Sequence, residues 1–131
     1  MEQPGYAPEY LAGIRYFNDR DFFESHEVWE DVWNDCDPAS RKFYQGLIQT
    51  AVALHHFGNG NLRGAVKLYH SSRAYLEPYQ PVYGGLNVAH LLDEMARCFE
   101  ALLASAEPDP DIEVDPELIP TLALDPPPAV E

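Results

Sequence analysis

Apolar residues recur along most of the chain at the three- and four-residue spacing of α-helices. The clearest stretch is residues 87–103, where one face is apolar and Asp93, Arg97 and Glu100 occupy the other. The same spacing predicts four earlier helices, over residues 8–18, 21–35, 38–58 and 61–77. Asp, Asn, Pro and Gly residues separate these segments as caps and turns. The fold class that follows is all-α, an irregular bundle of four to five helices with short links.

The pattern changes after residue 106. Seven of the 12 prolines lie between Pro108 and Pro128, among acidic residues, so regular helix is not expected there. Apolar residues such as Ile112 and Leu122 are nevertheless too frequent for a fully solvated tail. We therefore predict a helical bundle domain over 1–106 and an acidic, proline-rich extended tail over 107–131, partly packed on the bundle.

The segment 43–62 contains no Asp, Glu, Lys or Arg, although it carries Gln, His and Asn residues. It is too polar for a membrane span and too uncharged for a surface helix, which predicts a central helix covered on most sides. Gly46 would weaken the interior of this helix unless another helix packs closely there. We expect Gly46 and its small neighbours to receive Trp29 or Trp33.

Polar residues on three of the predicted helices form the candidate site. His26 and Glu30 are four residues apart, so both project from one face and can share a proton or grip an ion. Gln45, Gln49 and His56 form a polar ridge on the central helix, and this ridge needs hydrogen-bonding partners. The predicted buried cluster comprises His26, Glu27, Glu30, Gln45, Gln49, His56 and Arg73, with a carboxylate such as Glu27 or Glu30 beside Arg73.

Two interpretations of this cluster remain open. In the first, His26 and Glu30 are a hydrogen-bonded pair in a structural or ligand-binding network, and no cofactor is required. In the second, His26 and Glu30 bind a divalent metal, His56 completes the shell, with His55 or another carboxylate as alternatives, and Glu27 acts as general base. The spacing resembles the zinc helix of metalloproteases, but Glu30 stands where those enzymes have a second histidine.

The charge of the chain limits the classes of partner that we expect it to bind. It has 8 Lys and Arg residues against 22 Asp and Glu, a formal net charge of -14, so nucleic acid is not an expected partner. Neither a membrane span nor a signal peptide is predicted, and we expect a cytoplasmic protein. Such an acidic surface suits a halophilic, archaeal-like setting, where concentrated salt screens the repulsion. Cys36 and Cys98 are expected to be free thiols.

Three segments resemble the bacterial and archaeal family known as domain of unknown function 309. They are FNDRDFFESHEVWEDVW (17–33), FYQGLIQTAVALHHFGNGNLRGAVKLY (43–69) and SSRAYLEPY (71–79). The resemblance implies a compact helical domain that carries the His-Glu-x-x-Glu segment, here His26, Glu27 and Glu30, and the Gly-Leu-Ile-Gln segment, here 46–49. It implies no activity.

The function that these observations favour is a non-catalytic binding or interaction domain, because no complete catalytic set is present. Its partner would be a small molecule or another protein, and self-association is compatible with the sequence. The alternative is a metal-dependent hydrolase that uses His26, Glu27 and Glu30.

Overall fold

Five α-helices form the protein in a computed structural model that describes residues 5–104 and 110–128. The helices are α1 (Pro8–Asn18), α2 (Phe22–Asp35), α3 (Arg41–Gly58), α4 (Leu62–Leu76) and α5 (Val88–Leu103). Two short 3₁₀ turns, η1 (Glu77–Tyr79) and η2 (Pro116–Leu118), and a two-stranded hairpin of β1 (Val82–Tyr83) and β2 (Leu86–Asn87) complete the described elements. The predicted all-α bundle is confirmed.

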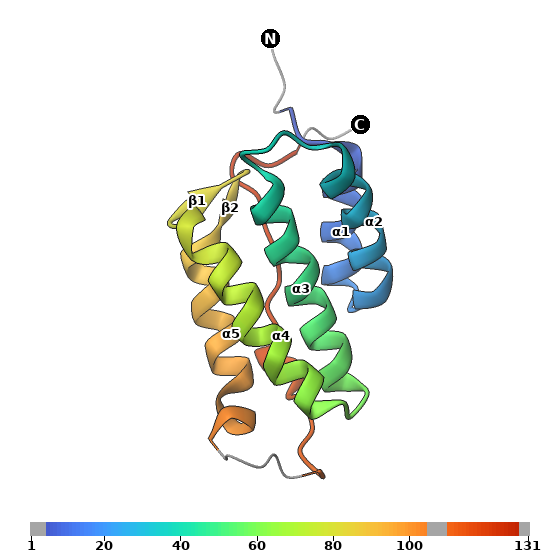
Figure 1. The fold of residues 1–131 in the computed structure, drawn as a ribbon, viewed down its shortest axis with the longest axis vertical. Helices are drawn as coiled ribbons and strands as arrows, with labels where there is room; N and C mark the ends of the chain where they lie inside the picture. Colours follow the sequence, from blue (N-terminus) through green and yellow to red (C-terminus); the bar gives the residue numbers. More distant parts are fainter. Residues whose placement is uncertain (1–4, 105–109, 129–131) are drawn as a thin grey trace.

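Helix α3 occupies the centre of the bundle (Figure 1). It packs against α2 on one side and α4 on the other, while α1 packs on α2 and α5 packs on α4. Because neighbours cover most of α3, charged side chains in its interior would lose their hydration without compensation, which explains why the segment lacks them. No helix among the described residues is long and apolar enough to cross a bilayer.

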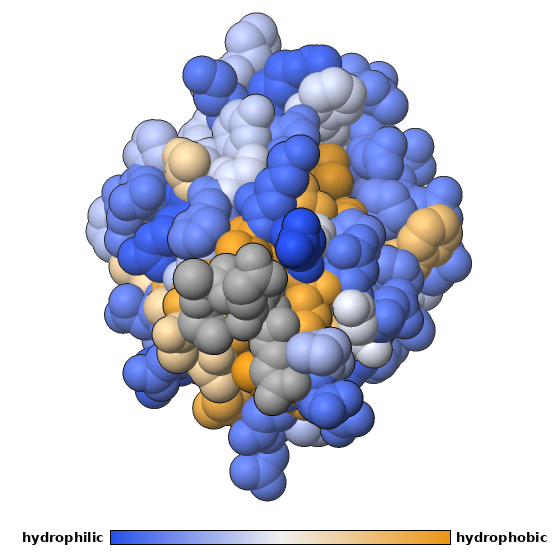
Figure 2. Space-filling model, turned by 60° about the horizontal axis from the view of Figure 1, so that its bottom comes forward, coloured by the Kyte–Doolittle hydropathy of each residue, from blue (hydrophilic) through white to orange (hydrophobic). Residues whose placement is uncertain are grey.

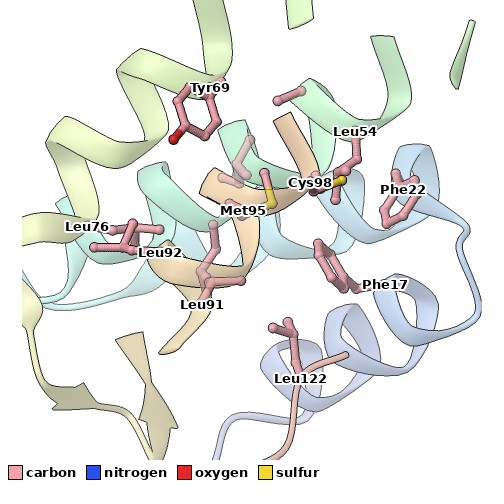
Figure 3. Close-up of a cluster of buried hydrophobic side chains, with 14 of the residues drawn as sticks. Phe17, Phe22, Leu54, Tyr69, Leu76, Leu91, Leu92, Met95, Cys98 and Leu122 are labelled. Carbon is pink, nitrogen blue, oxygen red and sulfur yellow. The ribbon is translucent and has the colours of Figure 1, made fainter. Parts of the chain in front are cut away.

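Aromatic and aliphatic side chains from every helix fill the core (Figure 3). Trp29 is fully buried and stands directly over Gly13 of α1, with its indole N–H donating to the carbonyl of Tyr10 at 3.2 Å. Gly46 instead faces Leu76 of α4, whose Cγ lies 2.6 Å from where a Cβ would stand. The expected close contact at Gly46 exists, but the expectation that a tryptophan makes it is wrong.

Two helix starts differ from the sequence-based predictions. Helix α3 begins at Arg41 and not at Pro38, because Asp37 Oδ1 accepts a hydrogen bond from the Ser40 amide at 2.9 Å and forms a separate turn. Asp21 precedes α2 but its side chain accepts no capping hydrogen bond. The Asn61 and Asn87 caps are present, accepting from the amides of Gly64 and His90.

The link between α4 and α5 contains a β-hairpin that the sequence analysis did not predict. Gly84 and Gly85 have φ values of +56° and +74°, which suit a tight two-residue turn. The hairpin pairs Val82 with Asn87 and Tyr83 with Leu86. It places Leu86, which is buried, at the end of the core.

Residues 110–128 run behind α3 in the view of Figure 1, from the α3–α4 turn to the β-hairpin. They contain no α-helix, and Pro120 and Leu122 are buried against the bundle. Figure 2 shows the lower end of the molecule, where apolar surface lies among hydrophilic residues. The described residues that line a pocket of about 550 Å³ at this end include Phe57, Ile112 and Val114. The predicted boundary between residues 106 and 107 lies outside the described residues.

Candidate functional site

His26 and Glu30 lie next to each other on α2, as their spacing predicts. His26 Nε2 is 3.2 Å from Glu30 Oε1, and Nδ1 contacts the backbone carbonyl of Phe23. Both neighbours are hydrogen-bond acceptors, and which ring nitrogen donates depends on the tautomer of His26. Since both ring nitrogens are engaged, neither one points at an open position from which it could take a substrate proton.

The pair is not buried in the interior of the bundle. The Glu30 side chain is 52% exposed and that of His26 is 17% exposed, and Glu27 lies on the solvent side of α2. The prediction of a buried cluster that includes both glutamates is therefore wrong. The physical reason is that Phe22, Ser25 and Trp29 form the inward face of α2, which turns the carboxylates away from the core.

The polar ridge of α3 lies where the sequence predicts, but none of the described contacts joins it to His26. Gln45 and Gln49 are partly buried, and Gln49 Oε1 is fully covered without a hydrogen-bond partner among the described residues. His56 Nδ1 lies 3.3 Å from Asn61 Nδ2 at the turn before α4. Partial burial, together with the nearby His55, lowers the pKa of His56.

Arg73 is directed toward α5 and not toward α2. Its Nη1 donates to the backbone carbonyl of Leu92 at 3.4 Å. A backbone carbonyl at the side of α5 therefore replaces the carboxylate that we expected from Glu27 or Glu30. This contact ties α4 to α5 and removes Arg73 from the candidate site.

The ligands of the metal-site interpretation do not come together. Within residues 5–104 and 110–128, no three His, Cys, Asp or Glu side chains are placed to hold a metal ion. His26 pairs with Glu30, whereas His56 pairs with Asn61. The hydrolase that would need His26, Glu30 and His56 as ligands gains no support from this geometry.

Phe23, which was not among the predicted site residues, and His55, which was an alternative third metal ligand, complete the surface around His26. Phe23 is 50% exposed, and its ring centre lies 4.9 Å from that of His26 and 5.7 Å from that of His55. The sequence carried a signal for Phe23, because the apolar stripe of α2 runs through Phe22 and Trp29, and Phe23 projects about 100° away from Phe22 around the helix. We call Phe23, His26 and His55 the imidazole patch.

Charge is divided sharply between two parts of the molecule. Residues 38–76, which contain α3 and α4, have five Lys and Arg residues and no Asp or Glu. The rest of the chain has three arginines and all 22 Asp and Glu residues. Basic side chains are exposed on this carboxylate-free hairpin at Arg41, Lys42, Arg63 and Lys67. Counted by sequence, the hairpin therefore carries a formal charge of +5 in a chain whose net charge is -14.

A shallow pocket of about 390 Å³ opens on the carboxylate-free hairpin. It is lined by Lys42, Ser71, Ala74, Tyr75 and Pro78. A lysine ammonium and a serine hydroxyl beside a tyrosine ring supply hydrogen-bond donors and an apolar wall to one ligand group. A carboxylate at the end of an aliphatic side chain matches this combination.

The fold and this division of charge define a small all-α domain whose basic residues are concentrated in one helical hairpin. Residues 10–68, which run from α1 into α4, match the family described as Domain of unknown function (DUF309). The matched segment is slightly less than half of the 131 residues, and over this segment the chain is similar to that family.

Two relatives are similar to this chain over most of its length. The uncharacterized protein YpuF of Bacillus subtilis is 34% identical over 92 residues, which cover 68% of this chain and 53% of that protein. An uncharacterized protein of Aquifex aeolicus is 30% identical over 101 residues, which cover 76% of this chain and 29% of that protein. The chain thus spans about half the length of the first relative and less than a third of the second.

Proposed function

We propose that this chain is a non-catalytic interaction domain whose carboxylate-free hairpin binds an acidic segment of a partner protein. The observation that carries the proposal is the charge division, with no Asp or Glu between residues 38 and 76. A positive face on a molecule of net charge -14 attracts an anionic segment locally. The same molecule repels a long polyanion such as nucleic acid, because the polyanion extends beyond this face.

The pocket beside Lys42 supports a peptide as the occupant. Its lining residues provide one cation, the hydroxyls of Ser71 and Tyr75, and apolar walls, which suits a single Glu or Asp side chain better than a row of phosphates. Lys67 of α4 is exposed on the same hairpin and offers a second contact for a carboxylate. His26 does not contribute a reactive group, since both of its ring nitrogens are engaged.

Charge reversal on the hairpin tests the proposal. Fluorescence anisotropy would follow the binding of a labelled peptide of glutamates and leucines at about 0.1 M salt. Lys42→Glu and Lys67→Glu should each weaken binding by roughly 3- to 10-fold, because an attractive contact becomes a repulsive one. A peptide with lysine at every glutamate position should not bind.

Arg97→Glu is the matched control, because Arg97 is exposed on α5 outside the hairpin and the change in net charge is the same. It should alter the affinity by less than about 2-fold. An equal loss in Arg97→Glu and Lys67→Glu would mean that only net charge matters. That outcome, or a wild-type protein that does not bind the glutamate peptide, would contradict the proposal.

A further inference from the structure

The C-terminal segment 119–126, which we call the strap, is held mainly through its backbone. Asn18 at the end of α1 donates to the Leu122 carbonyl at 2.9 Å and accepts from the Leu122 amide at 2.7 Å. Arg20 donates to the carbonyls of Pro120 and Ile119, at 2.9 and 3.2 Å. Tyr6 donates its hydroxyl to the carbonyl of Pro126 at 2.6 Å. Side chains of the bundle thus bind the strap as if it were a peptide ligand.

Two strap side chains are buried in the core, Pro120 fully and Leu122 at 5% exposed, while Thr121 and Ala123 face solvent. Ile119 and Leu124 are partly buried and pack against the edge of the core. Figure 3 shows Leu122 entering the apolar core beside α1. This two-residue spacing is that of an extended chain with alternate side chains in pockets. The strap is therefore recognised by its backbone and by a Pro-x-Leu pair.

The far end of the strap adds to the β-hairpin. Leu124 forms an antiparallel bridge with Leu86 of β2, and the Asp125 amide donates to the carbonyl of Gly85 at 2.8 Å. Strand addition to an exposed edge is a common mode of peptide recognition, because backbone bonds supply affinity for many sequences. The surface that the strap covers along α1 and β2, which we call the groove, thus presents this edge together with the Asn18 side-chain amide.

The groove is wider than the strap that occupies it. A pocket of about 390 Å³ remains between the strap and α1, lined on the helix side by Leu11, Ile14 and Arg15. It is mainly apolar and has one exposed cation at its rim. A longer apolar side chain than those of the strap would fill this space and bury more apolar surface.

We propose that the groove along α1 and the β-hairpin is a binding site for an extended Pro-x-Leu segment of a partner protein. The strap occupies this site in cis and competes with the partner. This surface is separate from the carboxylate-free hairpin, so the proposal does not depend on the proposed function. A covalently attached competitor has a high effective concentration, so a free peptide binds weakly until the strap is released.

Release of the strap in the 131-residue chain tests the proposal. Leu122→Asp places a charge in the core position and should free the strap. A labelled peptide of residues 116–126 should then bind at least ~10-fold more tightly to Leu122→Asp than to wild type, followed by anisotropy. Thr121→Asp is the matched control, because it adds the same charge at an exposed neighbour and should leave binding at the wild-type level.

Two further measurements distinguish binding in the groove from non-specific binding. Adding Asn18→Ala to Leu122→Asp should weaken peptide binding, because the peptide loses its paired backbone contact. Cys98 is buried near Arg20 and Asp115, so its alkylation rate should rise in Leu122→Asp but not in Thr121→Asp. If circular dichroism shows that Leu122→Asp has lost its helices, Leu124→Asp at the bridge replaces it.

The proposal is overturned if the folded, strap-released variant does not bind the peptide. It is equally overturned if that variant binds a peptide carrying Asp in place of Leu122 with the same affinity, because the groove would then not read the Pro-x-Leu pair.

Discussion

At the scale of single residues, the burial of Trp29 depends on one missing side chain. The indole ring occupies the place where a Cβ of Gly13 would stand, and Ser25 donates to the Gly13 carbonyl at 2.8 Å. Glycine is needed at this position for close approach of α1 and α2 and not for a special backbone angle. The contact between these two helices is therefore sensitive to a single methyl group.

Gly13→Ala should destabilise the protein by about 1 to 3 kcal/mol, because the methyl group forces the packed indole ring to move. Urea unfolding followed by tryptophan fluorescence would measure the change. Gly58→Ala is the control, since nothing lies within 4 Å of its added Cβ at the exposed end of α3. An equal loss of stability in both variants would show that the indole contact is not the cause.

His56 links stability to pH at the same scale. Burial first, and then the neighbouring His55, lower its pKa in the folded protein below the ordinary value of 6.5. The unfolded chain therefore binds a proton more readily than the folded one, so the contribution of His56 to stability is present above pH 6.5 and is lost as the pH falls. Near pH 8 the imidazole of His56 is neutral in the folded and in the unfolded chain, so its titration does not lower the free energy of unfolding.

His56→Gln should reduce the loss of stability between about pH 8 and about pH 5.5, because glutamine does not titrate. Urea denaturation midpoints at both pH values, for the variant and the wild type, would measure this difference. The opposite result, a steeper loss in His56→Gln, would mean that protonation of His56 stabilises the fold.

At the scale of elements, a side-chain cap forms at some helix starts where the sequence offers a capping residue, and not at others. Asn87 Oδ1 accepts from the His90 amide at 2.9 Å and satisfies one of the free amides at the start of α5. Asp21 occupies the equivalent position before α2, but its side chain makes no such bond. Asn87 and Asp21 therefore both stand at N-cap positions, but only Asn87 makes a capping hydrogen bond.

Asn87→Ala should destabilise the protein by about 1 kcal/mol, because α5 loses its side-chain cap. Asp21→Ala is the matched comparison and should cost clearly less, since no capping hydrogen bond is removed. Thermal or urea unfolding monitored by circular dichroism distinguishes the two. Equal costs would show that the structural difference between the caps has no energetic consequence.

At the scale of the whole molecule, charge lowers the stability of the folded state through repulsion and also provides a means of recognition. Helix α2 carries five acidic residues and no Lys or Arg, and its outer face repels the other carboxylates of the chain. Added salt screens this repulsion within a few ångströms of each charge. The same screening weakens binding of an acidic segment at the carboxylate-free hairpin, so salt should affect stability and binding in opposite directions.

The melting temperature should rise when KCl is raised from about 0.1 M to about 2 M, because screening relieves repulsion in the folded state. Differential scanning calorimetry would record it. A variant with Glu24→Gln, Glu27→Gln and Asp31→Asn, all exposed on α2, should show a smaller rise. A wild-type melting temperature that does not change with KCl would remove this explanation of the acidic surface.

The sequence by itself determined the helices and several of their ends. Periodicity and capping depend on residues close together in the chain. They give the bounds Pro8–Asn18 of α1, the end of α3 at Gly58, and the caps at Asn61 and Asn87. The His26–Glu30 contact is equally local, because one helix holds both residues. The central place of α3 followed from its lack of charge.

Only the tertiary structure decided which helices meet at each glycine, where Arg73 points, and that His26 and His56 lie in separate contacts. It also placed the strap against Asn18, about a hundred positions away in sequence. These contacts depend on packing angles and on the register between helices. A small rotation of one helix moves a side chain from a buried contact to solvent without any change in its local pattern.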